Sequence, residues 1–261
     1  RFRGNRNLQE AFEDLFFQYV KKLENKGYTE HSEVFVDGTK IESKANRYTF
    51  VWLKQVSKQL EKIKARLKEL VCPQGNLTST KVEKRPEQLN TEIKAQSIEV
   101  KKGRGHHKPE IVRERDELAL LYRRWMEYNR KKAICGENRN SYSKTDTDAT
   151  FMHMKDDHMR NGQLKPGYNV QFAVNSGFIT GIGVFSNRTD FGTLIPFLTY
   201  LWHKHGKSYR NVVADSGYES LANYRWLFEN GQTAFIKPAN YESGKKRSSK
   251  SQVGRMENMG Y

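Results

Sequence analysis

Apolar side chains recur along most of this chain at the spacing of an amphipathic helix or of a strand. From Asn7 to Leu23 they return every three or four residues, which predicts a helix that Asn7 caps and Gly27 ends. Short alternating runs bounded by Gly, Asn and Pro predict strands. The predicted helices are 7–23, 193–205 and 221–229, and the predicted strands are 33–37, 168–174, 178–185, 211–215 and 233–236.

The stretch from Phe50 to Cys135 has a different, helical pattern. Its first half carries an apolar seam at strictly alternating intervals of three and four residues, which is typical of a coiled coil. The seam residues are Leu53, Val56, Leu60, Ile63, Leu67 and Leu70. Pro73 and Gly75 end this helix, residues 76–105 are predicted to be a polar link, and a second helical pattern follows through 111–128. The sequence therefore predicts an inserted antiparallel helical hairpin, coiled-coil-like in its packing.

Without this insertion, the predicted order is strand, strand, strand, helix, strand, helix, strand. An antiparallel hairpin beside strands that alternate with helices indicates a mixed α/β sheet with helices on its faces. We expect four parts. They are 1–49 with the first helix and strand, the basic helical hairpin 50–137, the remainder of the sheet domain 138–240, and a flexible tail 241–261.

The charge balance points to a polyanionic partner. The 261 residues contain 46 Lys and Arg against 30 Asp and Glu, a formal net charge of +16. Between residues 50 and 135 there are 21 basic and 11 acidic residues, so much of the surplus lies in the helical hairpin. Neutralisation of phosphates would give such a surface affinity for nucleic acid. The alternative is an ordinary solvated face on a soluble basic protein.

Cysteine use and hydropathy exclude several classes of protein. Cys72 and Cys135 are the only cysteines and form no CxxC pair, so neither a zinc site nor a disulfide framework is expected. No apolar run approaches the ~20 residues that a membrane span needs. These features favour a protein of a reducing compartment, the cytoplasm, with no membrane partner.

Two short apolar strands each end on an aspartate that turn residues follow, at Asp37-Gly38 and at Asp215-Ser216-Gly217. A folded sheet can bring both carboxylates to one edge, where their oxygens would bind Mg²⁺ or Mn²⁺. Two such ions about 3.5–4 Å apart can stabilise the attacking and leaving oxygens of a phosphoryl displacement. The alternative is that each aspartate only caps an ordinary turn.

Four stretches resemble the DDE transposases of bacterial insertion sequences. VFVDGTKI at 34–41 is similar to their first catalytic strand, and VADSGY at 213–218 is similar to their second, the D-x-G-Y strand. SKTDTDA at 143–149 and GQLKPGYNVQ at 162–171 are similar to the body of the branch with a long helical insertion after the first Asp. The stretches follow the family's order and cover nearly the whole chain.

The resemblance implies an RNase H-like α/β fold, in which a mixed sheet is flanked by helices and here carries the helical hairpin. It also implies DNA strand cleavage and strand transfer by transesterification, with two divalent ions. Asp37 and Asp215 would be the first two members of the catalytic triad. A water, and later a DNA 3′-hydroxyl, would be the nucleophile.

The partner that this family implies is double-stranded DNA, both the element ends and the target. A homodimer or a higher assembly is compatible with that role, in the bacterial cytoplasm and on the nucleoid when DNA is bound. Four lysines are candidates for contacts with phosphates, namely Lys40, Lys144, Lys155 and Lys165.

One part of the family pattern is missing. The third acid is a Glu on a late helix in a Tyr…Arg…Glu…Lys pattern, and Glu257 lies in a tail without that pattern. We therefore expect an interior fragment that does not transpose DNA by itself. Two other functions stay open: a non-catalytic DNA-binding or assembly module, and an RNase H-like nuclease that cuts without strand transfer.

Overall fold

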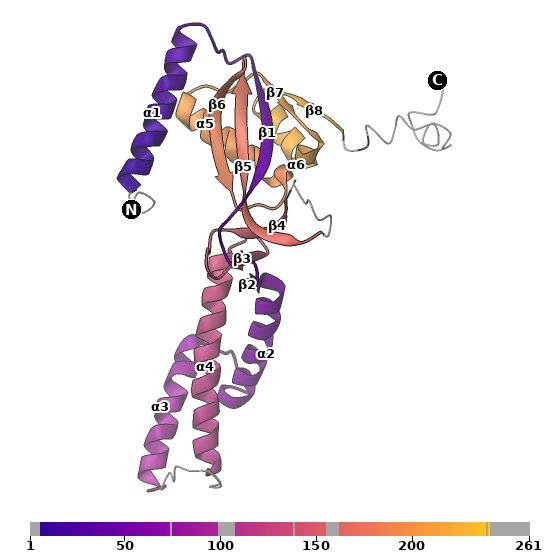
Figure 1. Cartoon of the computed structure of the whole chain (residues 1–261). Helices are drawn as coiled ribbons and strands as arrows, with labels where there is room; N and C mark the ends of the chain where they lie inside the picture. The colour runs from indigo at the N-terminus through magenta and orange to yellow at the C-terminus, as the bar shows by residue number, and fades with distance from the viewer. Residues whose placement is uncertain are drawn as a thin grey trace, which may run out of the picture. The chain divides into compact units, whose positions relative to one another are not determined.

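The computed structural model describes residues 6–73, 75–98, 108–137, 139–154, 162–238 and 240 (Figure 1). The chain divides into two compact units. The sheet unit comprises Arg1–Lys44 and Thr150–Tyr261, and the helical unit comprises Ala45–Ala149. The predicted flexible tail, 241–261, lies outside the described residues.

A six-stranded mixed sheet forms the centre of the sheet unit. Its strands are β1 (Glu33–Glu42), β4 (Thr150–His153), β5 (Leu164–Asn175), β6 (Phe178–Phe185), β7 (Asn211–Ala214) and β8 (Thr233–Ile236). Their order is β4–β5–β1–β7–β8, and β6 also pairs with β5. β5 is antiparallel to its neighbours, whereas β1, β7 and β8 are parallel to one another. A central first strand in such a mixed sheet is consistent with the RNase H-like fold, so the predicted fold class is confirmed.

Two helices, α5 (Leu194–His205) and α6 (Leu221–Glu229), pack on one face of this sheet (Figure 1). The strand residues in this core are Val34, Val36, Ala173, Val212, Ala214 and Ile236, and the helices contribute Leu194, Phe197, Leu198, Leu201 and Leu227. Side chains alternate between the two faces of a strand. Phe35 and Phe235 therefore point away from this core, and they are 46% and 54% exposed. Asp37 lies on the same face of β1 as Phe35, so its carboxylate is accessible to solvent.

The helix α1 (Arg6–Asn25) packs against α5 and β6. Val20 and Leu23 are buried there, but Phe12 and Leu15 are 64% and 60% exposed. The apolar face predicted for this helix is therefore covered only in part. The contact is made instead by the neighbouring Phe17, whose ring meets the rings of α5.

Two half-buried histidines lie where α1 meets the sheet unit. His31 stacks on Tyr209 with ring centroids 4.9 Å apart, and its ring contacts His205. His205 donates from Nε2 to the carbonyl oxygen of Thr180 at 3.1 Å. Burial lowers the pKa of both histidines; Glu24 acts in the opposite direction on both. Both rings are therefore neutral in the folded protein near pH 7.

We expect the sheet unit to lose stability as the pH falls below the ordinary histidine pKa. The unfolded chain then binds protons that the folded chain does not, so each histidine costs up to about 1.4 kcal/mol per pH unit until its lowered folded pKa is reached. Urea unfolding between pH 7.5 and 5 measures this loss. The double variant His31→Gln/His205→Gln should flatten the profile. If the double variant lost stability with falling pH as the wild type does, the two histidines would not be the cause of the loss.

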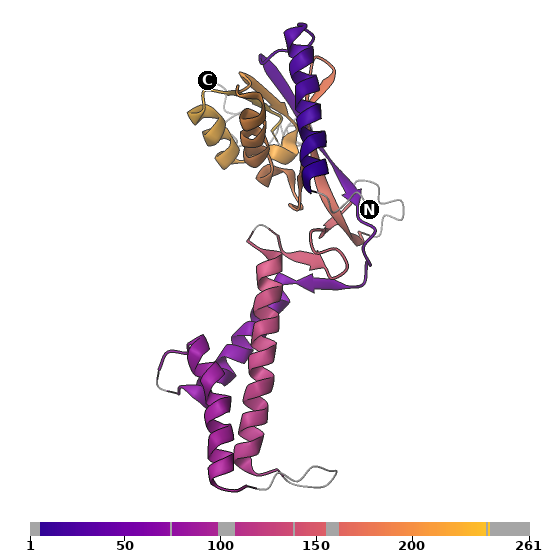
Figure 2. The same ribbon diagram turned by 90° about the vertical axis from the view of Figure 1, so that its left-hand side faces the viewer.

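The helical unit contains α2 (Leu53–Val71), α3 (Ser79–Ala95) and α4 (Glu110–Cys135), beside a two-stranded sheet of β2 (Phe50–Trp52) and β3 (Ser141–Ser143). α4 packs against both α2 and α3 (Figure 2). The seam predicted for the first helix is buried at Val56, Leu60, Ile63 and Leu67. None of the helices within the described residues is long and apolar enough to cross a membrane.

The link predicted between two helices was wrong, because residues 79–95 form the helix α3. Its side chains Val82, Leu89 and Ile93 are buried. Thr78 caps the first turn, its side chain accepting a hydrogen bond from the main-chain N–H of Lys81. The insertion is therefore a three-helix unit rather than a two-helix hairpin.

Candidate active site

Asp37 and Asp215 lie side by side at one end of the parallel strands β1 and β7. The register of this pair ends with Val36 opposite Ala214, so the two aspartates are the next residues along both strands. Both aspartates are exposed. The fold thus brings together two carboxylates that are far apart in the sequence.

Only one of these aspartates ends its strand. Asp215 follows β7 and caps the short 3₁₀ turn η3 (Ser216–Tyr218), with Oδ1 accepting from the N–H of Gly217 at 2.8 Å. Asp37 lies inside β1, because the pairing with β5 continues through Asp37 as far as Glu42. The prediction that Asp37 ends its strand was therefore wrong. The long antiparallel partner β5 extends β1 beyond the point where β7 stops.

A third carboxylate, which the sequence analysis missed, lies beside this pair. Asp190 opens the 3₁₀ turn η2 (Asp190–Gly192) just before α5, and it is half-buried. Its Oδ1 accepts hydrogen bonds from Asn169 Nδ2 at 2.6 Å and from Gln171 Nε2 at 3.3 Å. A Cβ atom on Gly217 would lie 3.2 Å from Asp190 Oδ2 and 3.0 Å from Asp215 Oδ1. Asp190 and Asp215 therefore border the same small space.

The charges of all three aspartates act on Tyr218. This side chain is 1% exposed, and its hydroxyl donates to Gln171 Oε1. Burial raises the pKa of the phenol most, followed by the negative charges of Asp190, Asp37 and Asp215. The phenol therefore stays protonated at neutral pH, and this end of the sheet is strongly electronegative.

The amides of Asn169 and Gln171 were the signal in the sequence that could have revealed the buried hydrogen bonds around Asp190. Both are fully buried on β5, on the side that faces the core. Two polar residues at core-facing positions of an alternating strand require partners, since an unpaired buried amide is costly. Their partner Asp190 lies about twenty residues away and has no local motif of its own.

Comparison with known families adds an independent observation. Residues 139–259 match a family model described as Transposase DDE domain. This part of the chain is similar to a transposase DDE domain. It includes Asp190 and Asp215, whereas Asp37 precedes it. No curated protein and no solved structure matches the chain significantly. The resemblance of the sequence to a DDE transposase is thereby confirmed.

Transposase DDE domains generally use divalent metal ions, and the residues at this edge fit such an ion. Asp37 and Asp215 offer hard carboxylate oxygens, the ligands that Mg²⁺ and Mn²⁺ prefer. The field of the three aspartates that acts on Tyr218 would also stabilise a cation. Within the described residues, no three His, Cys, Asp or Glu side chains converge closely enough to hold an ion. Water and DNA oxygens would complete the shell, as is common for Mg²⁺.

The four lysines proposed for phosphate contacts lie in different surroundings. Lys40 is half-buried on β1, three residues beyond Asp37. Lys165 on β5 forms an ion pair with Glu42 at 3.1 Å. Lys144 is exposed and belongs to the helical unit, and Lys155 lies outside the described residues. Lys40 and Lys165 thus remain as candidates on the strands of the site.

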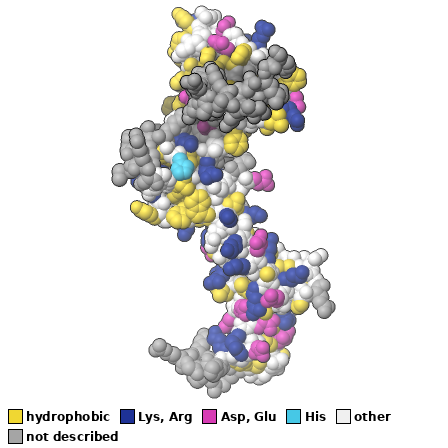
Figure 3. Space-filling view, turned by 90° about the vertical axis from the view of Figure 1, so that its right-hand side faces the viewer, with side chains coloured by type: hydrophobic (Ala, Val, Ile, Leu, Met, Phe, Trp, Pro, Cys, Tyr) yellow, Lys and Arg dark blue, Asp and Glu magenta, His cyan; other side chains and the backbone are white. Residues whose placement is uncertain are grey.

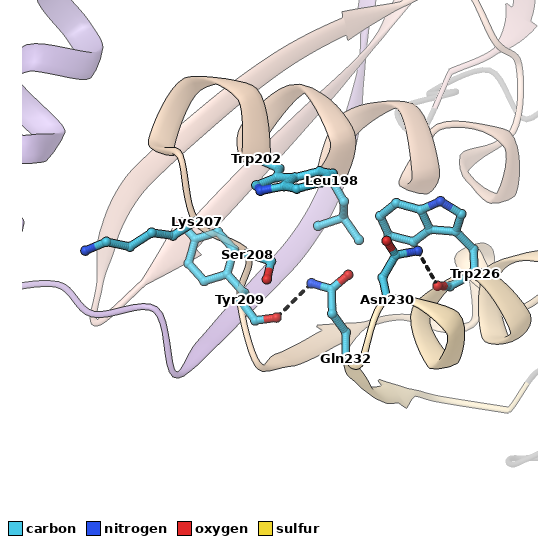
Figure 4. Close-up of a pocket in the computed structure, with 8 residues that line it drawn as sticks. All are labelled: Leu198, Trp202, Lys207, Ser208, Tyr209, Trp226, Asn230 and Gln232. Carbon is cyan, nitrogen blue, oxygen red and sulfur yellow. Dashed lines mark hydrogen bonds between the residues drawn. The ribbon is translucent and has the colours of Figure 1, made fainter.

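The sheet unit also contains a pocket of about 100 Å³ that is distinct from the aspartates (Figure 4). It is lined by Leu198, Trp202, Lys207, Ser208, Tyr209, Trp226, Asn230 and Gln232. Ser208 and Tyr209 precede β7, whereas Asp215 follows it, so the length of the strand separates the pocket from the carboxylates. The candidate site is therefore an open edge of the sheet and not this hollow.

Proposed function

We propose that Asp37 and Asp215 together bind divalent cations, Mg²⁺ or Mn²⁺, and that the chain serves metal-dependent cleavage and transfer of DNA strands. The observation that carries this proposal is the parallel register of β1 and β7, which ends one residue before both aspartates. A pair of exposed carboxylates at adjacent positions repels itself, so the arrangement is unfavourable without a cation.

The chain's own residues hold this pair in place. The N–H of Gly38 donates to Asp37 Oδ1 at 2.8 Å, and the N–H of Gly217 donates to Asp215 Oδ1 at the same distance. These bonds orient the two carboxylates, which remain exposed and therefore accessible to a substrate. The bound ions would supply activation of the attacking oxygen and charge stabilisation at the phosphate.

The helical unit supports a role in binding double-stranded DNA. Several of its acids are neutralised within the unit, for example Glu117 by Arg66 at 2.7 Å and Glu114 by Arg85 at 3.3 Å. Basic and acidic side chains are mixed over the face that Figure 3 shows. Since the unit carries a basic surplus, these internal pairs leave lysines and arginines available to phosphates.

The test is a titration of the isotope-labelled chain with Mn²⁺, observed by NMR. The paramagnetic ion broadens amide signals close to it, so the signals of Gly38 and Gly217 should disappear first, and Mg²⁺ should compete. Equal broadening over the whole surface would refute the metal site. It would favour the alternative, a non-catalytic DNA-binding module in which the aspartates cap turns. Metal binding with cleavage of DNA but no joining would instead favour an RNase H-like nuclease.

A further inference from the structure

The buried amide of Gln171 links the segments that carry the two aspartates. Its Nε2 donates to Asn169 Oδ1 at 2.7 Å and to Asp190 Oδ1 at 3.3 Å, and its Oε1 accepts from the Tyr218 hydroxyl. A carboxylate can only accept, so the NH₂ group of the amide must face Asp190. The amide therefore has one orientation, and Asp190 sets it.

Gln171 packs directly against the main chain next to Asp37. A Cβ atom on Gly38 would lie 2.3 Å from Gln171 Nε2, a distance that no real side chain could keep. Only glycine permits the backbone of β1 to approach this amide so closely. The position of the Gln171 amide therefore limits how closely the main chain beside Asp37 can approach β5.

The turn after Asp215 is tied to the turn of Asp190 in two further ways. Asn223 Nδ2 donates to the carbonyl oxygen of Phe191 at 3.0 Å and to that of Tyr218 at 2.7 Å, which bridges η2 and η3. Asp190 Oδ2 also lies close to Gly217, 3.2 Å from the place that a Cβ atom on this residue would take. A shift of η2 would therefore move the turn that Asp215 caps.

We infer that Asp190 is a positioning residue, whose carboxylate holds both aspartate-bearing segments of the site in register through Gln171. The inference rests on the proposed function, because it assigns a role toward the same two aspartates. Removal of the carboxylate would leave the NH₂ groups of Asn169 and Gln171 short of an acceptor in a buried layer. Such a loss is relieved by rotation of the amides, which would displace Gly38 and Tyr218.

Two substitutions at this position separate positioning from direct metal binding. Asp190→Asn keeps an oxygen that can accept from both amides but removes the charge, whereas Asp190→Ala removes the acceptor as well. We expect Asp190→Ala to shift the amide signals of Gly38 and Gly217 and to weaken Mn²⁺ binding at least about tenfold. Asp190→Asn should keep both signals in place and the affinity within about threefold.

Two results would overturn the inference. One is an Asp190→Ala variant with unmoved Gly38 and Gly217 signals. The other is an Asp190→Asn variant that loses as much Mn²⁺ affinity as Asp190→Ala, which would make Asp190 a ligand. If Asp190→Ala does not fold, Tyr218→Phe replaces it, since this variant removes only the hydroxyl that donates to Gln171. It should shift the Gly38 signal, and an unmoved signal would again count against the inference.

The Mn²⁺ affinity and the amide signals of Gly38 and Gly217 test the proposed function and this inference separately. A wild-type chain without Mn²⁺ affinity refutes the metal site, while the glycine signals still decide the role of Asp190. Glu229→Ala is the matched control, because Glu229 is an exposed acid at the end of α6. It should change neither the glycine signals nor the affinity.

Discussion

Replacing Asp37 or Asp215 by Asn is expected to weaken the binding of Mn²⁺ at least about tenfold, and replacing both is expected to abolish it. Each change keeps the shape of the side chain and removes one anionic ligand from an electronegative edge. The loss should be similar for the two residues, because they occupy adjacent positions of the parallel pair β1 and β7. Isothermal titration with Mn²⁺ at constant ionic strength measures both affinities.

The same variants should bind double-stranded DNA as well as the wild type or better, since each loses a negative charge near the phosphates. Glu229→Gln is the control for a general effect of charge, as it removes an exposed acid from α6. Unchanged Mn²⁺ affinity in the double variant would reject the metal site and leave the aspartates as turn-capping residues. An equal loss of Mn²⁺ affinity in Glu229→Gln would mean that the aspartate variants act only through the net charge of the protein.

Truncation of Leu67 to Ala is expected to destabilise the helical unit by about 2–5 kcal/mol. Leu67 is fully buried in the cluster where α2 meets α3 and α4, with Ile63, Val82, Leu89 and Leu118. The loss combines the transfer free energy of the removed methyl groups with the cost of the cavity that remains. Denaturant unfolding followed by far-ultraviolet circular dichroism measures it, because α2, α3 and α4 are helical.

Hydrogen exchange shows where this effect is confined. Amides of α2, α3 and α4 should lose protection, while those of β1 and β5 in the sheet unit should keep theirs if the two units unfold separately. Lys64→Ala is the matched control, because this exposed residue lies on the same helix. A stability change below about 1 kcal/mol for Leu67→Ala would contradict the assignment of this side chain to the core.

Most elements could be predicted from the sequence, and the failures have identifiable causes. The helix α6 and the strand β8 match their predicted ranges, because local periodicity and the stops at Gly231 and Pro238 determine them. The helix α3 was missed since Pro86 lies inside it and its apolar positions are sparse. Val82, Leu89 and Ile93 are buried because the other helices, chiefly α4, offer a surface for them to pack on.

The candidate site was predictable in part. The motifs around Asp37 and Asp215 pointed to two strands and to the pairing of their carboxylates. The extension of β1 beyond Asp37 was not predictable, because it depends on pairing with β5, more than a hundred residues away. Asp190 escaped notice because it has no local motif of its own and its partners, Asn169 and Gln171, lie on another element.

The sequence by itself determined the periodic elements, the basic surplus and the two aspartate motifs that resemble a transposase. These properties depend on composition and on neighbours within a few residues, so they can be read without the fold. Only the tertiary structure decided that Asp37 lies inside a strand, that a three-helix unit forms, and that Asp190 joins the aspartates through Gln171. Those features depend on register and on buried hydrogen bonds between distant segments, which form only once the whole chain has packed.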